Sequence, residues 1–193
     1  MEGKMKAIMI SIKPQWVEKI LNGEKTIEIR KTIPKCELPV KVYIYCTMPN
    51  KQENRKPHSW KVVWLKRVVA EFTLNEVEKF EVFENGSVQN WNAYDLEKSC
   101  LTYDQIANYV GHCKTGYAWH IDDLKIYETP KELSEFSHYI PNNKCPKKEC
   151  GIDCEDCMSY DVEHETCLDL YYLHRQIKRP PQSYCYVEEL GNV

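Results

Sequence analysis

Residues 23–31 read Gly23-Glu24-Lys25-Thr26-Ile27-Glu28-Ile29-Arg30-Lys31, and this stretch leads from the predicted end of a helix into a strand. A glycine such as Gly23 often follows the last helical residue, because it adopts a left-handed backbone without strain. Residues 25–30 alternate polar and apolar side chains, as a half-buried strand does. The alternation places Glu28 and Arg30 on one strand face, about 7 Å apart, with Lys25 at the strand entry. The sequence therefore predicts a compact cluster of one carboxylate and two cations.

Two interpretations of this charged cluster stay open. Glu28 can accept a hydrogen bond from the exocyclic amine of a base, and Arg30 can donate in a fork to a phosphate or a carbonyl. Alternatively, the three groups form a salt-bridged outer strand face with a purely structural role. Lys13 and Lys31 flank the cluster, where they either contact phosphate or are simply solvated.

The surrounding segments predict a fold made mainly of strands. The expected elements are a strand at 5–12, a helix at 14–22, a strand at 40–47, a long or bent strand at 60–73, a helix from Thr102 to Gly111, a strand pair within 115–127 and an edge strand within 179–190. We also expect a capping box of Thr102 with Gln105, and a second one at Thr129–Glu132 that starts a short helix or turn at Leu133–Phe136. Residues 74–100 are acidic and weakly patterned. This order indicates an α+β protein, a small mixed β-barrel with helices on its rim, and does not fit a doubly wound parallel sheet.

Composition and charge limit the class of protein. The chain has 193 residues, 42% hydrophobic and 28% charged, which suits one domain with an appendage. Because no apolar run has the length of a signal peptide or a spanning helix, we expect a soluble, cytoplasmic protein without a membrane partner. The net charge of −3 excludes a generally basic nucleic-acid coat. However, residues 1–72 carry 15 Lys and Arg against 7 Asp and Glu, and such a cationic part can steer an anion to one face.

Cysteines cluster near the C-terminus, where residues 141–166 are poor in Val, Ile and Leu. Such a segment needs a cross-link, a metal or docking on the main domain to become ordered. Cys154-x-x-Cys157 can place two thiolates on one tetrahedral ion. The spacing predicts a structural zinc site, with an iron–sulfur cluster as the alternative. A third interpretation is that the cysteines are reduced and bind no metal. The candidate ligands, in order of preference, are Cys154, Cys157, Cys150, Cys167 and Cys145, with His164 and His174 as substitutes.

The signature also resembles a known family. The run G-x-K-x-x-E-x-R, occupied by Gly23, Lys25, Glu28 and Arg30, is similar to the signature of the ASCH domain, a superfamily with a PUA-like β-barrel fold. The segment Ser11-Ile12-Lys13-Pro14 is similar to the one that precedes the signature in many bacterial and phage members. Residues 117–121, YAWHI, resemble the closing barrel strand, and residues 179–184, RPPQSY, resemble tails of phage and prophage ASCH proteins. The resemblance covers roughly residues 5–130, and the tail more loosely.

Together with the change in composition after Ile140, the resemblance suggests a domain at 1–140 and a Cys-rich extension at 141–193 that docks on it. The resemblance implies RNA or a modified nucleotide as the ligand of a pocket over the signature, since PUA-like relatives commonly bind RNA. A small bacterial branch hydrolyses acetylcytidine with a signature lysine, which Lys25 matches, and a threonine nucleophile, whose position Glu28 occupies here. Glu28 can act as a general base toward water while Lys25 stabilises an oxyanion, or it can simply bind a base.

Three hypotheses follow for the function. The first is binding of RNA or a modified nucleotide, with Lys13, Lys25, Glu28, Arg30 and Lys31 at the site. The second is an amidohydrolase that acts on an acylated cytidine, with Lys25 and Glu28 as the catalytic pair. The third is a protein-interaction module whose contact surface is the Cys-rich segment.

Overall fold

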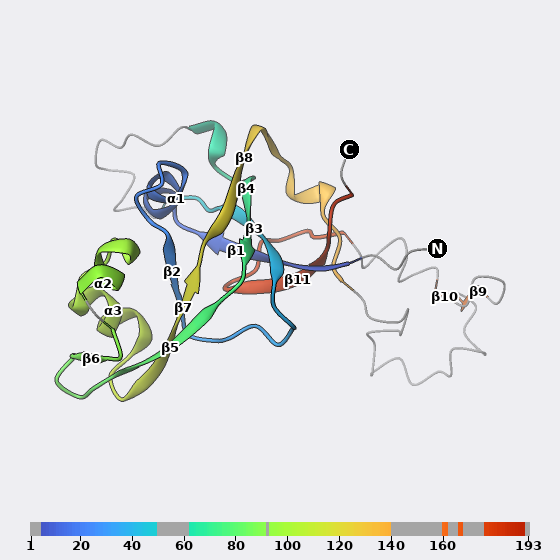
Figure 1. Cartoon of the computed structure of the whole chain (residues 1–193). Helices are drawn as coiled ribbons and strands as arrows, with labels where there is room; N and C mark the ends of the chain where they lie inside the picture. The colour runs from blue at the N-terminus through green and yellow to red at the C-terminus, as the bar shows by residue number, and fades with distance from the viewer. Residues whose placement is uncertain are drawn as a thin grey trace.

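The computed structural model describes residues 5–49, 62–91, 93–139, 160–161, 166–167 and 176–191 (Figure 1). Its elements, in chain order, are β1 (Lys6–Ile12), α1 (Pro14–Leu21), β2 (Ile27–Arg30), β3 (Val40–Cys46), the 3₁₀ helix η2 (Val62–Trp64), β4 (Arg67–Leu74), β5 (Val77–Val82), β6 (Val88–Gln89), α2 (Ala93–Ser99), α3 (Tyr103–Val110), β7 (Lys114–His120), β8 (Asp122–Lys131), the 3₁₀ helix η3 (Leu133–Glu135), β9 (Tyr160–Asp161), β10 (Thr166–Cys167) and β11 (Tyr184–Glu188). Strands predominate and helices are few, so the α+β class is confirmed.

Two sheets form the body of the protein. One has five strands in the order β11-β1-β3-β4-β8, and the other has four in the order β2-β7-β5-β6. Strands β1 and β3 are parallel, and every other pair within these two sheets is antiparallel. A parallel pair needs a crossover connection, and here the crossover carries α1 and β2. The segment with the charged cluster is thus the link between two neighbouring strands of the larger sheet.

The prediction of a β-barrel is wrong in one respect, because the described residues form no closed barrel. Within these residues the chain passes between the sheets four times: from β1 to β2 and back to β3 in the crossover, from β4 to β5 through Asn75 and Glu76, and from β7 to β8 through Ile121 (Figure 1). The last two passages are short bends, which bring the sheets together along one seam. At the other side β2 is an edge strand, with no backbone ladder to the five-stranded sheet. The two sheets are therefore not closed into a barrel on that side.

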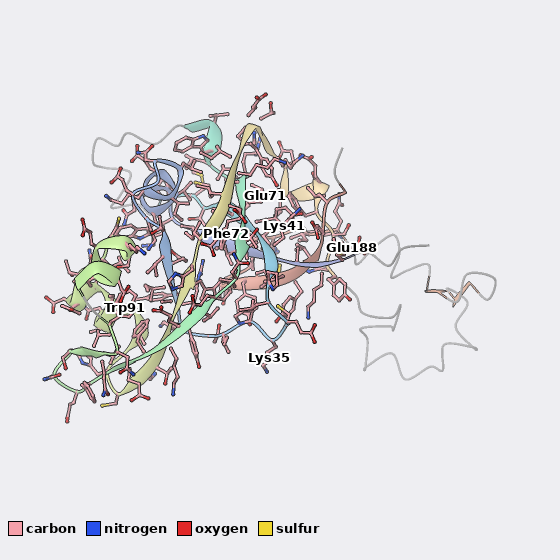
Figure 2. The ribbon with its side chains drawn as sticks, in the orientation of Figure 1. Lys35, Lys41, Glu71, Phe72, Trp91 and Glu188 are labelled. Carbon is pink, nitrogen blue, oxygen red and sulfur yellow. The ribbon has the colours of Figure 1, made fainter. Side chains whose placement is uncertain are left out.

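The central strands β1 and β3 of the five-stranded sheet are buried on both faces. In β1, Ile8 and Ile10 belong to the main core, whereas Ala7 and Met9 belong to a second core on the opposite face. This explains why β1 reads as a nearly continuous apolar run and not as an alternating one. The main core also contains Phe72 of β4, which Figure 2 labels.

A third core lies between the four-stranded sheet and the helices α2 and α3. Its members are Ile27, Ile29, Phe80, Val82, Trp91, Ile106, Ala107, Val110 and Ala118. Trp91 stacks on Phe80 with 5.0 Å between ring centroids and is only 8% exposed, so it anchors its loop (Figure 2). The burial of Trp91 excludes a role in stacking on a base.

The local signals in the sequence explain most element ends. Pro14 lies in the first turn of α1, and Gly23 follows the helix with a φ of +75°. Thr102 caps α3 through the predicted capping box with Gln105. The second predicted capping box is wrong, because β8 continues through Lys131 and the box around η3 pairs Glu132 with Glu135. The short helix or turn expected at 133–136 is nevertheless present as η3, with Glu132 and not Thr129 at its N-cap.

The remaining elements are the C-terminal strand and those within residues 74–100. Strand β11 pairs with β1 at the edge of the larger sheet, as predicted, with Val187 opposite Ala7. Residues 74–100, which carry little pattern, contain β5, β6 and α2. No helix within the described residues has the length and apolar character needed to cross a membrane.

Candidate functional site

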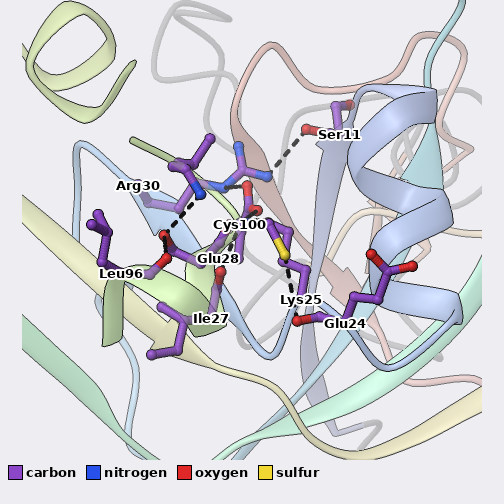
Figure 3. Close-up of polar contacts among 10 residues, drawn as sticks. Ser11, Glu24, Lys25, Ile27, Glu28, Arg30, Leu96 and Cys100 are labelled. Atoms are coloured by element: carbon purple, nitrogen blue, oxygen red, sulfur yellow. Dashed lines mark hydrogen bonds and ion pairs between the residues drawn. The ribbon is translucent and has the colours of Figure 1, made fainter. Parts of the chain in front are cut away.

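The three charged residues of the signature lie together, as predicted. Lys25 follows α1, and Glu28 and Arg30 lie on β2. The Lys25 ammonium nitrogen is 3.4 Å from Glu28 Oε2, and Arg30 Nε is 3.3 Å from Glu28 Oε1 (Figure 3). A single carboxylate is therefore held between two cations, in the arrangement that the strand alternation indicates.

Lys25 is the most deeply buried member of the cluster, at 2% exposure. Its Nζ donates to the carbonyl oxygens of Ile27 and Ser99, each at 2.7 Å, and the third acceptor is Glu28. Burial lowers the pKa of Lys25, and the Glu28 carboxylate opposes that effect. Three acceptors around one ammonium match its three N–H donors, so the protonated form fits this geometry. Lys25 acts here as a fixed cation that joins β2 to the end of α2.

Arg30 connects the cluster to the larger sheet. Its Nη2 donates to the Ser11 carbonyl oxygen at 3.1 Å, so the guanidinium spans from β2 to β1 (Figure 3). The side chain of Arg30 is 5% exposed, that of Lys25 1% and that of Glu28 11%. Of the three groups, the carboxylate of Glu28 is therefore the one that solvent or a ligand reaches most readily. Arg30 orients it and has little surface of its own to offer.

Exposed cations and an aromatic ring surround the cluster. Lys31 lies directly after Arg30, with Nζ 5.0 Å from the ring centroid of Tyr109 on α3. Tyr109 is 40% exposed, and burial of its hydroxyl end raises its pKa, an effect that the Arg30 guanidinium opposes. Lys13 is exposed at the N-cap of α1, two residues beyond the Ser11 carbonyl that Arg30 binds. Lys31 thus lies next to the cluster in the chain and forms an exposed cation–aromatic pair with Tyr109, whereas Lys13 is linked to the cluster only through the neighbouring Ser11.

Other residues at the site carry no signal in the sequence. Ser99 contributes a backbone carbonyl, which any residue type supplies, so only its burial and its place at the end of α2 mark it. Cys100 donates from Sγ to the Glu24 carbonyl oxygen at 3.4 Å and closes the same corner (Figure 3). Tyr109 belongs to the apolar stripe of α3, which predicts burial, and its contact with Lys31 depends on tertiary packing.

The predicted metal ligands fall mostly outside the part of the chain that the structure describes. Cys145, Cys150, Cys154 and Cys157 lie there, as do His164 and His174, and Cys167 is described only as a residue of β10. The zinc site therefore stays a prediction. Among the described residues, the free thiols are Cys36, Cys46, Cys100, Cys113 and Cys185.

The comparisons with known proteins concern the fold. No protein-family model matches the chain, and no curated protein matches it. Among solved structures, a point mutant of the ASCH protein from Zymomonas mobilis is 19% identical and covers 95% of this chain and 89% of its own, with a TM-score of 0.55. A second mutant of that protein is 24% identical over 75% of this chain and 87% of its own, with a TM-score of 0.50. The unmodified protein is 23% identical over 74% and 83%, with a TM-score of 0.49.

The similarity extends over nearly the whole chain in one comparison, and it agrees with the signature at 23–30 and with the α+β order of elements. We conclude that this chain has the fold of the ASCH domain.

Proposed function

We propose that this protein binds RNA or a modified nucleotide at the charged cluster of Lys25, Glu28 and Arg30. The observation that carries the proposal is the state of Glu28, whose carboxylate is held between two buried cations and still keeps 11% of its side chain exposed. A carboxylate fixed in this way is a preorganised acceptor for an N–H group. The exocyclic amine of a nucleobase offers such a group.

The surroundings of Glu28 support a nucleotide as the ligand. Lys13 and Lys31 are exposed beside the cluster and suit phosphate oxygens, which need cations on the surface. Tyr109 adds an exposed aromatic ring next to Lys31, and bases stack on such rings without regard to sequence. In this arrangement Glu28 reads the base, the lysines hold the backbone, and Arg30 and Lys25 position Glu28.

Binding to a short single-stranded RNA, measured by fluorescence anisotropy over a series of salt concentrations, tests the proposal. We expect Lys31→Ala to weaken binding and to reduce the slope of log K against log salt by about one, since each lost phosphate contact removes one released counterion. Glu28→Gln should weaken binding with the salt slope unchanged, because it alters base contact and no phosphate contact. Lys125→Ala, an exposed lysine on β8 that is 68% exposed, is the matched control and should change neither.

Three other outcomes would redirect the assignment, the first of them from an assay with acetylcytidine as substrate. Release of free cytidine from acetylcytidine, lost in Lys25→Met, would make the site an amidohydrolase. If the RNA is bound equally by the wild type, Glu28→Gln and Lys31→Ala, the cluster is structural and the proposal is wrong. A protein that binds neither RNA nor nucleoside would favour the third hypothesis, a protein-interaction module.

We further propose that four of Cys145, Cys150, Cys154, Cys157 and Cys167 hold a structural zinc ion, on the strength of their spacing alone. Metal analysis of the purified protein tests this, with zinc at one equivalent as the expected result. A brown protein with visible absorbance would show that the cysteines hold an iron–sulfur cluster and not zinc.

A further inference from the structure

We infer that Glu76, Glu78 and His120 form a binding site for a divalent transition-metal ion, separate from the charged cluster and from the Cys-rich segment. Glu76 and Glu78 stand at the start of β5, and His120 ends β7. The two strands are antiparallel, with Val77 opposite Trp119, so Glu76 lies opposite His120 and Glu78 is its diagonal neighbour on the same face. Side-chain alternation thus brings one imidazole and two carboxylates to a single corner of the sheet.

The distances suit a shared ion. The ligand atoms of the three residues all lie within 4.8 Å of one another, and His120 Nε2 is 3.4 Å from Glu78 Oε1. Two ligands of one ion with bond lengths of about 2.1 Å lie up to about 4.2 Å apart, so small rotations of the glutamates complete the site. One nitrogen and two oxygen donors are the set that zinc and its neighbours in the first transition row accept.

The ring nitrogen of His120 gives an independent indication. His120 Nε2 is shielded from solvent and makes no hydrogen bond, and its 3.4 Å contact with Glu78 Oε1 is an ion pair only when the ring is protonated. In the neutral ring this nitrogen is unsatisfied, which is costly, and a metal ion satisfies it while neutralising two carboxylates that otherwise repel each other. With three protein ligands, at least one coordination position stays available for water.

Titration of the chelator-treated, reduced full-length protein with Co²⁺, followed by visible absorption and calorimetry, tests this site. Cobalt bound by thiolates shows sulfur-to-metal charge transfer, whereas cobalt bound by imidazole and carboxylates does not. We expect a binding step without charge transfer in the wild type. Glu78→Gln should weaken that step by about tenfold or more, since even changes outside the ligand shell cost about that much. His120→Gln should remove it.

The matched control is Glu81→Gln, on the same strand but on its other face, where Glu81 pairs with Lys79 at 3.4 Å. It should leave the binding step within twofold of the wild type. Because the Glu78 side chain is 38% exposed, its substitution leaves the fold intact, and thermal unfolding of the metal-free variants verifies this. A wild type without this step, or equal binding by wild type and both site variants, overturns the inference and leaves His120 and Glu78 as an ion pair.

A second measurement locates the ion directly. Small additions of Mn²⁺ should broaden the amide resonances around residues 76–78 and 120 before others. Broadening centred elsewhere, with these resonances sharp, would also overturn the inference.

Discussion

At the scale of single residues, the charged cluster depends on Lys25. Its ammonium satisfies two backbone carbonyls and one carboxylate from two separate parts of the chain, Ile27 and Glu28 on β2 and Ser99 at the end of α2. The sequence predicts that Lys25, Glu28 and Arg30 lie together, because their relative positions depend only on the local geometry of the strand and its entry. The partners Ser11 and Ser99 could not be predicted, because backbone carbonyls leave no trace in residue type.

Replacing Lys25 by methionine should lower the free energy of unfolding by about 3–5 kcal/mol, as loss of one partner of a buried ion pair does. The change leaves Glu28 with Arg30 alone and removes the donor to the carbonyls of Ile27 and Ser99. Urea unfolding measures the effect. The control is Lys19→Met, which breaks an exposed pair with Glu24 at 2.9 Å and should cost less than about 1 kcal/mol. Equal stability of the two variants would show that Lys25 is dispensable to the fold.

At the scale of elements, the sequence predicts the strands and helices with regular patterns and misses those without them. Strand β1, helix α1 and strand β3 lie within one or two residues of their predicted bounds, since each has a clear apolar run or stripe. By contrast, β5 and α2 lie in the acidic stretch at 74–100. The buried residues of β5 are only Phe80 and Val82, and Phe80 meets Trp91, which precedes α2, only in the folded protein.

The capping box of α3 permits a direct test. The Thr102 hydroxyl accepts from the Gln105 amide nitrogen at 3.2 Å, and the Gln105 side chain accepts from the Thr102 amide nitrogen at 2.9 Å. Thr102→Ala should therefore cost about 1 kcal/mol in denaturant unfolding. Thr102→Ser keeps the oxygen and should stay within a few tenths of a kcal/mol of the wild type. If serine costs as much as alanine, the lost methyl group and not the cap explains the change.

The pairing of β5 with β7 depends on a glycine. Gly116 lies opposite Phe80, and a Cβ at Gly116 would collide with the Phe80 ring, which is itself stacked on Trp91. Gly116→Ala should destabilise the protein by about 1–3 kcal/mol through overpacking. Phe80→Leu, which shortens the side chain, should reduce that cost in the double variant, so a double-mutant cycle should give a favourable coupling energy. Additive effects would show that the ring moves aside freely.

At the scale of the whole molecule, the two ends of the chain are joined. Strand β11 pairs with β1, and the Leu190 amide donates to the Tyr43 hydroxyl at 2.9 Å, so the C-terminal strand is tied to the centre of the larger sheet. Phe136 and Ile177 pack in the same core as Val187 of β11. This arrangement indicates that β11 unfolds together with the rest of the sheet.

Cys185 on β11 reports on that cooperativity. Burial raises its pKa to about 11 from an ordinary value near 9, so its thiolate is scarce at pH 8. In pulsed alkylation read by mass spectrometry, Cys185 should react only at the denaturant concentration at which tryptophan fluorescence reports unfolding. The exposed Cys113 should react without denaturant and serves as the internal control. Reaction of Cys185 at a clearly lower concentration would show that β11 detaches on its own.

The crossover between β1 and β3 has a further consequence for synthesis on the ribosome. The signature at 23–31 is translated before the residues that it contacts. Ser99, whose carbonyl binds Lys25, and β7 at residues 114–120, which pairs with β2, both follow it in the chain. Strand β1 pairs with β3 on one side, but its other edge stays open until β11 at residues 184–188 has been translated. The nascent chain therefore carries an incomplete site until residues 99–120 are made, and an open edge on its first strand until β11 follows.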